Sequence, residues 1–220
     1  MDAASYPDFR RDEPLDKEPL TMDEVLIGGI EKRAITVVDY DPRWPGMFQK
    51  HAEILSRALG DKALAIEHVG STSVPGLAAK PIIDIDVIVE DSSDEASYLP
   101  VLIQAGYVLR VREPDWHQHR MVRTTGLDVH VHLFSPGCIE FTRHRVFRDH
   151  LRTCEEDRLL YESVKRKLAK EDWPDMTAYA QAKTEVVEGI LARASKRLSS
   201  TTKFLLSLTC DAEQAIPPPR

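Results

Sequence analysis

The residues best suited to chemistry lie within the segment 68–89. There a Gly70-Ser71 pair precedes Asp84 and Asp86, two aspartates that alternate with branched apolar residues. The apolar run predicts a buried β-strand, whose side-chain period of two places both carboxylates on one face. Two like charges in a buried strand need a cation or a proton to offset them. Mg²⁺ is the natural candidate, because it takes hard oxygen ligands and keeps positions for substrate phosphates.

The turn before this strand is suited to phosphate. Gly70, Ser71 and Thr72 offer backbone N–H groups and hydroxyls that can approach phosphate oxygens closely. Lys80, at the mouth of the aspartate strand, could neutralise a triphosphate as a point charge, although a solvated surface lysine is an equally good interpretation. These residues therefore predict a site for nucleotide phosphates.

A second alternating segment, 127–134, carries Asp128, His130 and His132 on one face. If that face meets the face of the two aspartates, carboxylates and imidazoles converge on one pocket. The histidines could also be structural hydrogen-bonding groups. A further alternative is a zinc site that combines them with His117 and His119, since paired imidazoles can supply a tetrahedral set of ligands.

Gly70-Ser71 followed by Asp84-Ile-Asp86 resembles the signature of the nucleotidyltransferase superfamily, and the longer string 68–86 resembles the GrpB family within it. The likeness covers roughly residues 35 to 195. It continues through four more strings, namely Tyr40-Asp-Pro-Arg-Trp-Pro45, Asp128-Val-His-Val-His-Leu-Phe134, Phe147-Arg-Asp149 and Tyr179-Ala-Gln-Ala-Lys-Thr184.

This resemblance implies roles for particular residues. The superfamily adds a third carboxylate from a neighbouring strand, for which Asp128 is the candidate, so Asp84, Asp86 and Asp128 would be the catalytic residues and the ligands of Mg²⁺. The GrpB-like strings place the His-x-His strand beside a nucleotide pocket. Arginine on the expected meander could also bind phosphate bidentately. The candidate substrate-pocket residues are His68, Arg120, His130, His132, Arg148 and Lys183.

The implied function is magnesium-dependent transfer of a nucleotidyl group from a nucleoside triphosphate to an acceptor that the motifs do not specify. Two alternatives remain: a catalytically silent nucleotide- or metabolite-binding module, and a histidine–zinc hydrolase. GrpB-like domains also occur fused to dephospho-coenzyme-A kinases. This sequence has no Gly-x-x-x-x-Gly-Lys-Ser/Thr loop, so it does not carry that kinase motif.

Composition limits the number of domains, the partners and the cellular location to be expected. The 220 residues are 42% hydrophobic, enough for one good core, and carry a net charge of −7. This net charge argues against general nucleic-acid binding. Eight acidic and three basic residues precede Val25, so the remainder is nearly neutral and leaves locally basic patches available for phosphate. Cys138, Cys154 and Cys210 lie too far apart in the sequence to form a Cys-x-x-Cys motif. With no long apolar run and no leader-like beginning, the expectation is a soluble, cytoplasmic protein without a membrane partner.

The expected fold is α/β (α+β), a nucleotidyltransferase-like mixed sheet flanked by helices, with a helical C-terminal portion. We expect a partly flexible acidic arm over 1–33, one domain over 34–197 and a disordered tail over 198–220. Strands are predicted at 35–38, 64–69, 82–89, 107–112, 118–124 and 127–134, and helices at 48–60, 94–105, 139–153, 155–170 and 174–197.

Overall fold

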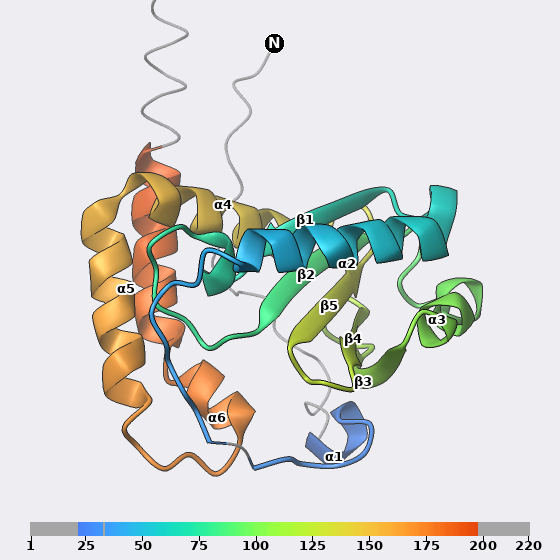
Figure 1. Ribbon diagram of the computed structural model, residues 1–220, viewed down its shortest axis with the longest axis horizontal. Coiled ribbons are helices and arrows are strands. Elements are labelled where there is room, and N and C mark those ends of the chain that lie inside the picture. The colour runs from blue at the N-terminus through green and yellow to red at the C-terminus, as the bar shows by residue number, and fades with distance from the viewer. Residues whose placement is uncertain (1–21, 33, 198–220) are drawn as a thin grey trace, which may run out of the picture.

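The computed structural model describes residues 22–32 and 34–197, and a mixed five-stranded sheet is its centre (Figure 1). The strand order is β1-β2-β5-β4-β3. Strands β2 and β5 are parallel, and the other neighbours are antiparallel. The strand bounds are β1 Ala65–Val69, β2 Ile83–Ile88, β3 Tyr107–Glu113, β4 His119–Thr124 and β5 Val129–Phe134. The mixed sheet confirms the expected fold class.

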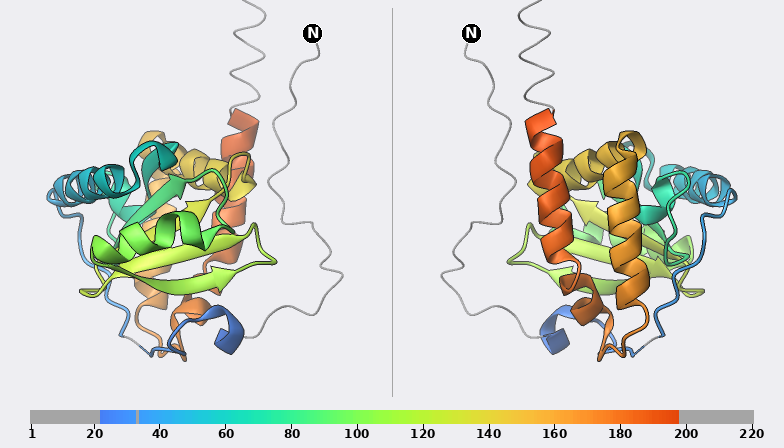
Figure 2. Two further views of the ribbon diagram at one scale, coloured as in Figure 1. Left: turned by 90° about the vertical axis from the view of Figure 1, so that its right-hand side faces the viewer. Right: turned by 90° about the vertical axis from the view of Figure 1, so that its left-hand side faces the viewer.

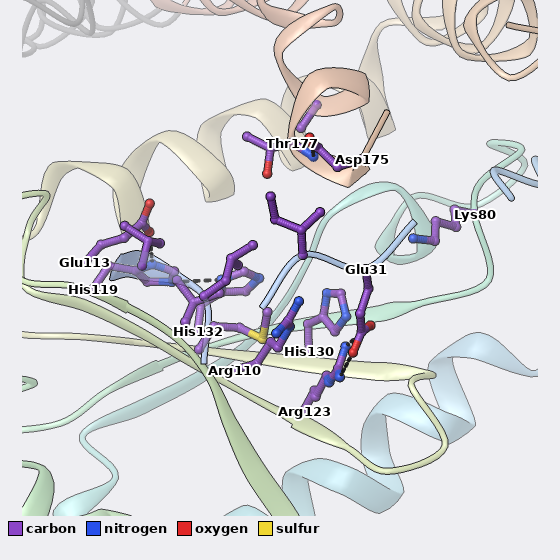
Figure 3. Close-up of a pocket in the computed structure, with 16 residues that line it drawn as sticks. Glu31, Lys80, Arg110, Glu113, His119, Arg123, His130, His132, Asp175 and Thr177 are labelled. Atoms are coloured by element: carbon purple, nitrogen blue, oxygen red, sulfur yellow. Dashed lines mark hydrogen bonds and ion pairs between the residues drawn. The ribbon is translucent and has the colours of Figure 1, made fainter. Parts of the chain in front are cut away.

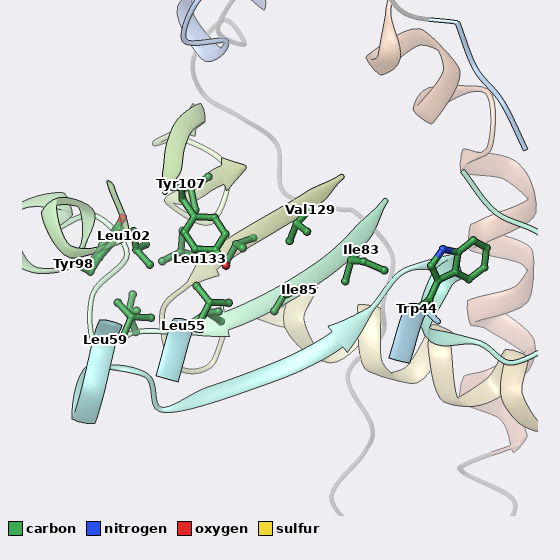
Figure 4. Close-up of a cluster of buried hydrophobic side chains, with 14 of the residues drawn as sticks. Trp44, Leu55, Leu59, Ile83, Ile85, Tyr98, Leu102, Tyr107, Val129 and Leu133 are labelled. Carbon is green, nitrogen blue, oxygen red and sulfur yellow. The ribbon is translucent and has the colours of Figure 1, made fainter. Parts of the chain in front are cut away.

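One face of the sheet is apolar and holds the main core (Figure 4). The helices α2 (Trp44–Leu59) and α3 (Glu95–Gln104) cover it. Leu55 and Tyr98 from these helices are fully buried, as is Ile85 from β2. Because side chains alternate along a strand, this packing turns Asp84 and Asp86 to the opposite face.

The opposite face meets the C-terminal helices α4 (Ile139–Thr153) and α5 (Glu155–Leu168) and a helical segment over 184–197. Helix α5 and the segment 184–197 run side by side, on the other side of the sheet from α2 (Figure 2). A second, smaller core joins them to the loop after β1. Its buried members are Val74, Leu77, Leu151, Tyr161 and Ile190.

The helix expected over 174–197 is broken in two. Helix α6 (Met176–Gln181) begins at Asp175, whose side chain accepts hydrogen bonds from the backbone N–H groups of Thr177 and Ala178. A turn at residues 182–183 separates it from the segment 184–197. The break places Lys183 in a cavity wall rather than along one continuous helix.

The strand expected at 35–38 is reduced to a single bridge between Val38 and Ala79, so it adds no strand to the sheet. Near the N-terminus, α1 (Met22–Val25) is followed by a bridge from Leu26 to Val111. Residues 1–21 and 198–220, which carry most of the predicted arm and the whole predicted tail, lie outside the described residues. Within the described ranges, no helix has the length and apolar character needed to cross a bilayer.

Candidate functional site

The centre of the polar face is a cluster of Asp84, His130 and His132. The parallel register pairs Asp84 with His130 and Asp86 with His132, so all of these side chains leave the sheet on one side. Asp84 Oδ1 lies 3.6 Å from His130 Nδ1 and 3.9 Å from His132 Nε2. The three side chains are 31%, 21% and 22% exposed, respectively. The cluster is therefore sheltered but open on one side.

Gly70 makes room for Asp84. It has a φ of +67°, and a Cβ at this position would overlap Asp84 Oδ2 and lie 3.0 Å from Asp84 Cβ. Just after it, the Thr72 hydroxyl donates to the Ile82 carbonyl at 3.1 Å. The glycine turn therefore packs directly on the aspartate strand.

Asp86 has a different environment from Asp84, although it shares the same face. It is fully buried, and its Oδ2 accepts a hydrogen bond from His144 Nδ1 at 2.8 Å. Burial alone would lower the pKa of His144, but the Asp86 carboxylate outweighs that effect and raises it. Asp86 Oδ1 is also buried and has no hydrogen-bond partner among the described residues. Asp86 is thus an internal partner of helix α4 and lines neither of the two cavities described below.

A hydrogen-bonded chain runs from Glu113 through His119 to His132 (Figure 3). Glu113 Oε2 lies 2.6 Å from His119 Nδ1, and His119 Nε2 lies 2.9 Å from His132 Nδ1. Burial lowers the pKa of His119 to about 4, so its ring is neutral near pH 7. A neutral His119 that donates from Nδ1 to Glu113 must accept at Nε2, and His132 is then the donor from its own Nδ1. His132 Nε2 is left facing Asp84, at 3.9 Å from Oδ1.

A cleft of about 270 Å³ opens beside Asp84 and His130. Lys165 is almost fully buried in its wall, where it donates to the Ala78 carbonyl and lies over the Tyr161 ring. Burial lowers the pKa of Lys165 to about 7 and also lowers the pKa of Lys183. The cleft therefore joins amines to the carboxylate–imidazole cluster. Its other lining residues are Ser71, Thr72, Lys80, Ile82, Tyr179 and Ala180.

A second cavity of about 370 Å³ adjoins the first, and the two share Lys80 and His130 (Figure 3). Its walls come from the sheet, from α6 and from residues 25–31. Arg123 closes part of the wall through an ion pair with Glu31 at 2.6 Å. The segment just after α1 thus contributes to the surroundings of the cluster.

The structure brings most of the predicted site residues together. Six of them line the smaller cleft, namely Ser71, Thr72, Lys80, Asp84, His130 and Lys183. His132 lines the larger cavity, and Gly70 touches Asp84 from the adjoining turn.

The predicted third carboxylate, Asp128, is not brought to Asp84 and Asp86. Its Oδ1 accepts a hydrogen bond of 2.6 Å from the Thr124 hydroxyl, across the turn between β4 and β5. Leu127 has a φ of +65°, so the regular alternation of β5 does not extend back to Asp128. This carboxylate is a turn residue here, and the expected magnesium site of three carboxylates is not assembled.

Three other predicted pocket residues also have structural partners. Arg120 donates to Glu95 at 2.6 Å, and Arg148 donates to Glu67 at 2.7 Å. His68 stacks on Phe48 with 4.6 Å between ring centroids. These residues line neither cavity, because each is buried in contacts that hold the sheet to its helices.

Sequence reasoning missed His144 and Lys165. His144 belongs to a helical stripe in α4 that also includes Glu140 and Leu151, both buried, so helical spacing could have indicated that it faces inward. Lys165 gave no such signal, because a lysine in a charged helix is ordinarily solvated.

Replacing Gly70 should test the contact with Asp84. We expect Gly70→Ala to destabilise the fold and to displace the Asp84 carboxylate, because the new Cβ overlaps it. Gly76→Ala is the matched control: Gly76 has a φ of +77° but open space around its Cα, so it should cost only the backbone strain of about 1–2 kcal/mol. Urea unfolding would compare them. Equal losses in the two variants would contradict the account.

Buried neutral histidines should make the fold acid-sensitive. Burial lowers the pKa values of His68, His119 and His130 to about 4, whereas an unfolded histidine titrates near 6.5. Between these values the unfolded chain binds more protons, so the free energy of unfolding should fall as the pH drops from 6.5 to 4. Each histidine contributes up to about 1.4 kcal/mol per pH unit.

His68→Gln should make this slope shallower by one histidine's share. The raised pKa of His144 acts in the opposite sense and above pH 6.5, outside this window. Urea unfolding at several pH values would measure the slope. An identical slope in the variant and the wild type would show that His68 is not held neutral.

Comparisons with known proteins agree with the fold. Residues 34–193 match the GrpB protein family. The chain is 48% identical over 176 residues to a UPF0157 protein of Halalkalibacterium halodurans, covering 79% of this chain and 90% of that protein. It is 50% identical over 169 residues to a UPF0157 protein of Streptomyces coelicolor, covering 77% and 89%.

The crystal structure of the conserved protein GrpB from Enterococcus faecalis has a similar fold, with a TM-score of 0.67 and 31% identity. The match covers 74% of this chain and 99% of that one. A dephospho-CoA kinase of Mycolicibacterium paratuberculosis is 29% identical over 180 residues, and the match spans 44% of its length. From the family match and these relatives, the chain belongs to the GrpB family.

Proposed function

We propose that this protein is a nucleotidyltransferase that uses the cleft beside Asp84. The observation that carries the proposal is the shared wall of that cleft, in which Asp84 and His130 lie together with Lys165 and Lys183. Amines suit the oxygens of a triphosphate, and a carboxylate–imidazole cluster suits an acceptor hydroxyl. The likeness of the Gly70-Ser71 and Asp84-x-Asp86 pattern to nucleotidyltransferases gives further support.

Magnesium enters the proposed reaction as the counter-ion of the triphosphate. The donors do not fit a resident Mg²⁺ held by three carboxylates, because Asp86 is hydrogen-bonded to His144 and Asp128 is hydrogen-bonded to Thr124. Mg²⁺ commonly reaches proteins bound to substrate phosphates and keeps several of its waters. We therefore treat it as part of the substrate.

The lysines would bind and orient the triphosphate. Lys165 and Lys183 sit over the rings of Tyr161 and Tyr179, at 4.7 Å and 4.5 Å from the ring centroids. Their lowered pKa values mean that burial disfavours the charged amines. A bound phosphate would reverse this preference, so nucleotide binding should be accompanied by proton uptake near pH 7.

The chemical step would be an in-line displacement at the α-phosphorus. The acceptor oxygen forms a bond to that phosphorus, the bond to the α–β bridging oxygen breaks, and pyrophosphate leaves. The acceptor's hydroxyl proton passes to the Asp84 carboxylate. Burial alone would raise the pKa of Asp84, but the nearby imidazoles and Lys183 lower it, so the carboxylate is ionised. Most of the rate enhancement would come from positioning and charge neutralisation.

A catalytically silent nucleotide-binding module is the second candidate. The observation that favours it is the position of Asp128, which leaves the superfamily's third carboxylate outside the cleft. The kinase activity named for the mycobacterial relative is not proposed here, because this sequence has no P-loop motif.

Calorimetric titration with each nucleoside triphosphate, with and without Mg²⁺, tests the proposal. Lys183→Met should weaken binding by at least about tenfold, or about 1.4 kcal/mol, because it removes an amine from the cleft wall. Lys167→Met is the control, since Lys167 is exposed on α5 and lines neither cavity. Asp84→Asn should retain binding.

Turnover separates the two candidates. Pyrophosphate release in the presence of a pool of hydroxyl-bearing metabolites, lost in Asp84→Asn, would support the transferase. Nucleotide binding without any pyrophosphate release would favour the silent module. If no nucleoside triphosphate binds to the wild type, both candidates fail.

A further inference from the structure

We propose that Asp84, His130 and His132 form a binding site for a borderline transition-metal ion such as Zn²⁺, Mn²⁺ or Co²⁺, with coordination positions left open toward the cleft. One carboxylate oxygen and two ring nitrogens all lie within 4.8 Å of one another. This inference concerns the same pocket as the proposed function but does not depend on nucleotidyl transfer.

The spacing of the three ligand atoms is the first argument. Asp84 Oδ1 is 3.6 Å from His130 Nδ1 and 3.9 Å from His132 Nε2, both too long for hydrogen bonds. Two ligands on one tetrahedral ion, at bond lengths of about 2.0–2.2 Å, are separated by about 3.4 Å. The two distances from Asp84 would therefore need to shorten by only a few tenths of an ångström, and the two ring nitrogens already lie within 4.8 Å of each other.

The second argument is the support behind His132. Histidines that bind metals almost always use their other nitrogen in a hydrogen bond that fixes the ring and its tautomer. His132 has such a bond from Nδ1 to His119, and His119 is anchored in turn by Glu113. This chain fixes the His132 ring so that Nε2 faces Asp84, as a metal ligand requires.

The type of donor selects the type of metal. Two imidazoles with one carboxylate suit zinc, manganese or iron, whereas Mg²⁺ and Ca²⁺ prefer oxygen ligands throughout. Three protein ligands leave room for water or substrate, which is the arrangement of catalytic rather than structural sites. An ion here would lower the pKa of a bound acceptor hydroxyl or water.

The other cluster of potential ligands in the described chain, His150, Cys154 and Asp157, shows why proximity alone does not suffice. Arg193 donates to both oxygens of Asp157, at 2.5 Å and 3.1 Å, and His150 Nε2 lies 2.6 Å from Oδ2. The guanidinium already supplies the charge that a cation would bring. By contrast, Asp84 Oδ1 lies 3.6 and 3.9 Å from the ring nitrogens of His130 and His132, so those groups are not drawn together into hydrogen bonds.

This site replaces the four-histidine zinc hypothesis. His119 uses both ring nitrogens in its bonds to Glu113 and His132, so it supports a ligand and is not itself one. His117 has a φ of +53° in the turn before β4 and is absent from the cluster. Asp84 is the ligand that the sequence-based zinc hypothesis did not include.

The direct test is titration of the chelator-treated full chain with Co²⁺, followed by visible absorption, and competition by Zn²⁺, Mn²⁺ and Mg²⁺. We expect one Co²⁺ per chain with ligand-field bands, displaced by Zn²⁺ far more readily than by Mg²⁺. His132→Ala and, independently, His130→Gln should each weaken binding at least about a hundredfold. Glu113→Gln should weaken it by about 10–100-fold through the supporting bond.

His117→Ala is the matched control and should bind Co²⁺ as the wild type does. Circular dichroism of each variant shows whether it is folded, and the two ligand variants are read separately, so loss of fold in one leaves the other informative. Absence of stoichiometric binding of Co²⁺, Zn²⁺ and Mn²⁺ by the wild type overturns the inference, as does unchanged affinity in a folded ligand variant. Nucleotide titrations without transition metal stand apart, so failure of the metal site is distinguishable from failure of the proposed function.

Discussion

The parallel pairing of β2 with β5 places two aspartates of a buried strand beside two histidines, and the rest of the structure accommodates that pairing. A carboxylate in such surroundings is costly unless a partner offsets its charge. Asp86 receives its partner from helix α4, through His144. Asp84 faces His130 and His132 across distances too long for hydrogen bonds. Its negative charge therefore has no close hydrogen-bonded partner in these two histidines, and this makes Asp84 the better candidate for binding or chemistry.

Both faces of the sheet help to position Asp84 beside the two histidines. The apolar face fixes the register of β2 and β5, because a slip by one residue would exchange Ile85 for a carboxylate in the core beneath α2. The polar face then lies beside the C-terminal half, which adds the buried amine of Lys165 on α5 and the partly buried Lys183 in the turn after α6. Their lowered pKa values reflect the same desolvation that lowers the pKa of His130. A phosphate bound by Lys165 and Lys183 and a metal ion bound at Asp84 would therefore favour each other's binding, because their opposite charges would lie in the same cleft.

Much of this arrangement could be predicted from the sequence. Alternating or continuous apolar runs identified all five strands, and the period of two correctly put Asp84 and Asp86 on one face. Periodicity failed at Asp128, because the left-handed backbone at Leu127 breaks the alternation one residue before the strand. Periodicity also could not show that Asp86 is hydrogen-bonded to His144 whereas Asp84 lines the cleft. That difference depends on how helix α4, some 60 residues later, packs against the sheet. The pairing of His119 with His132 likewise required the register of β4 against β5, which no local pattern specifies.

The central claim is that Asp84, rather than Asp86 or Asp128, is the carboxylate that works with the two histidines of β5. Anomalous diffraction from crystals of the full chain grown with Zn²⁺ or Mn²⁺, with data collected at the absorption edge of the metal, addresses it most directly. Our account predicts one strong anomalous peak bonded to Asp84 Oδ1, His130 Nδ1 and His132 Nε2, with Asp86 still bound to His144. A peak coordinated by Asp86 and Asp128, or no ordered peak on this face of the sheet, would contradict it.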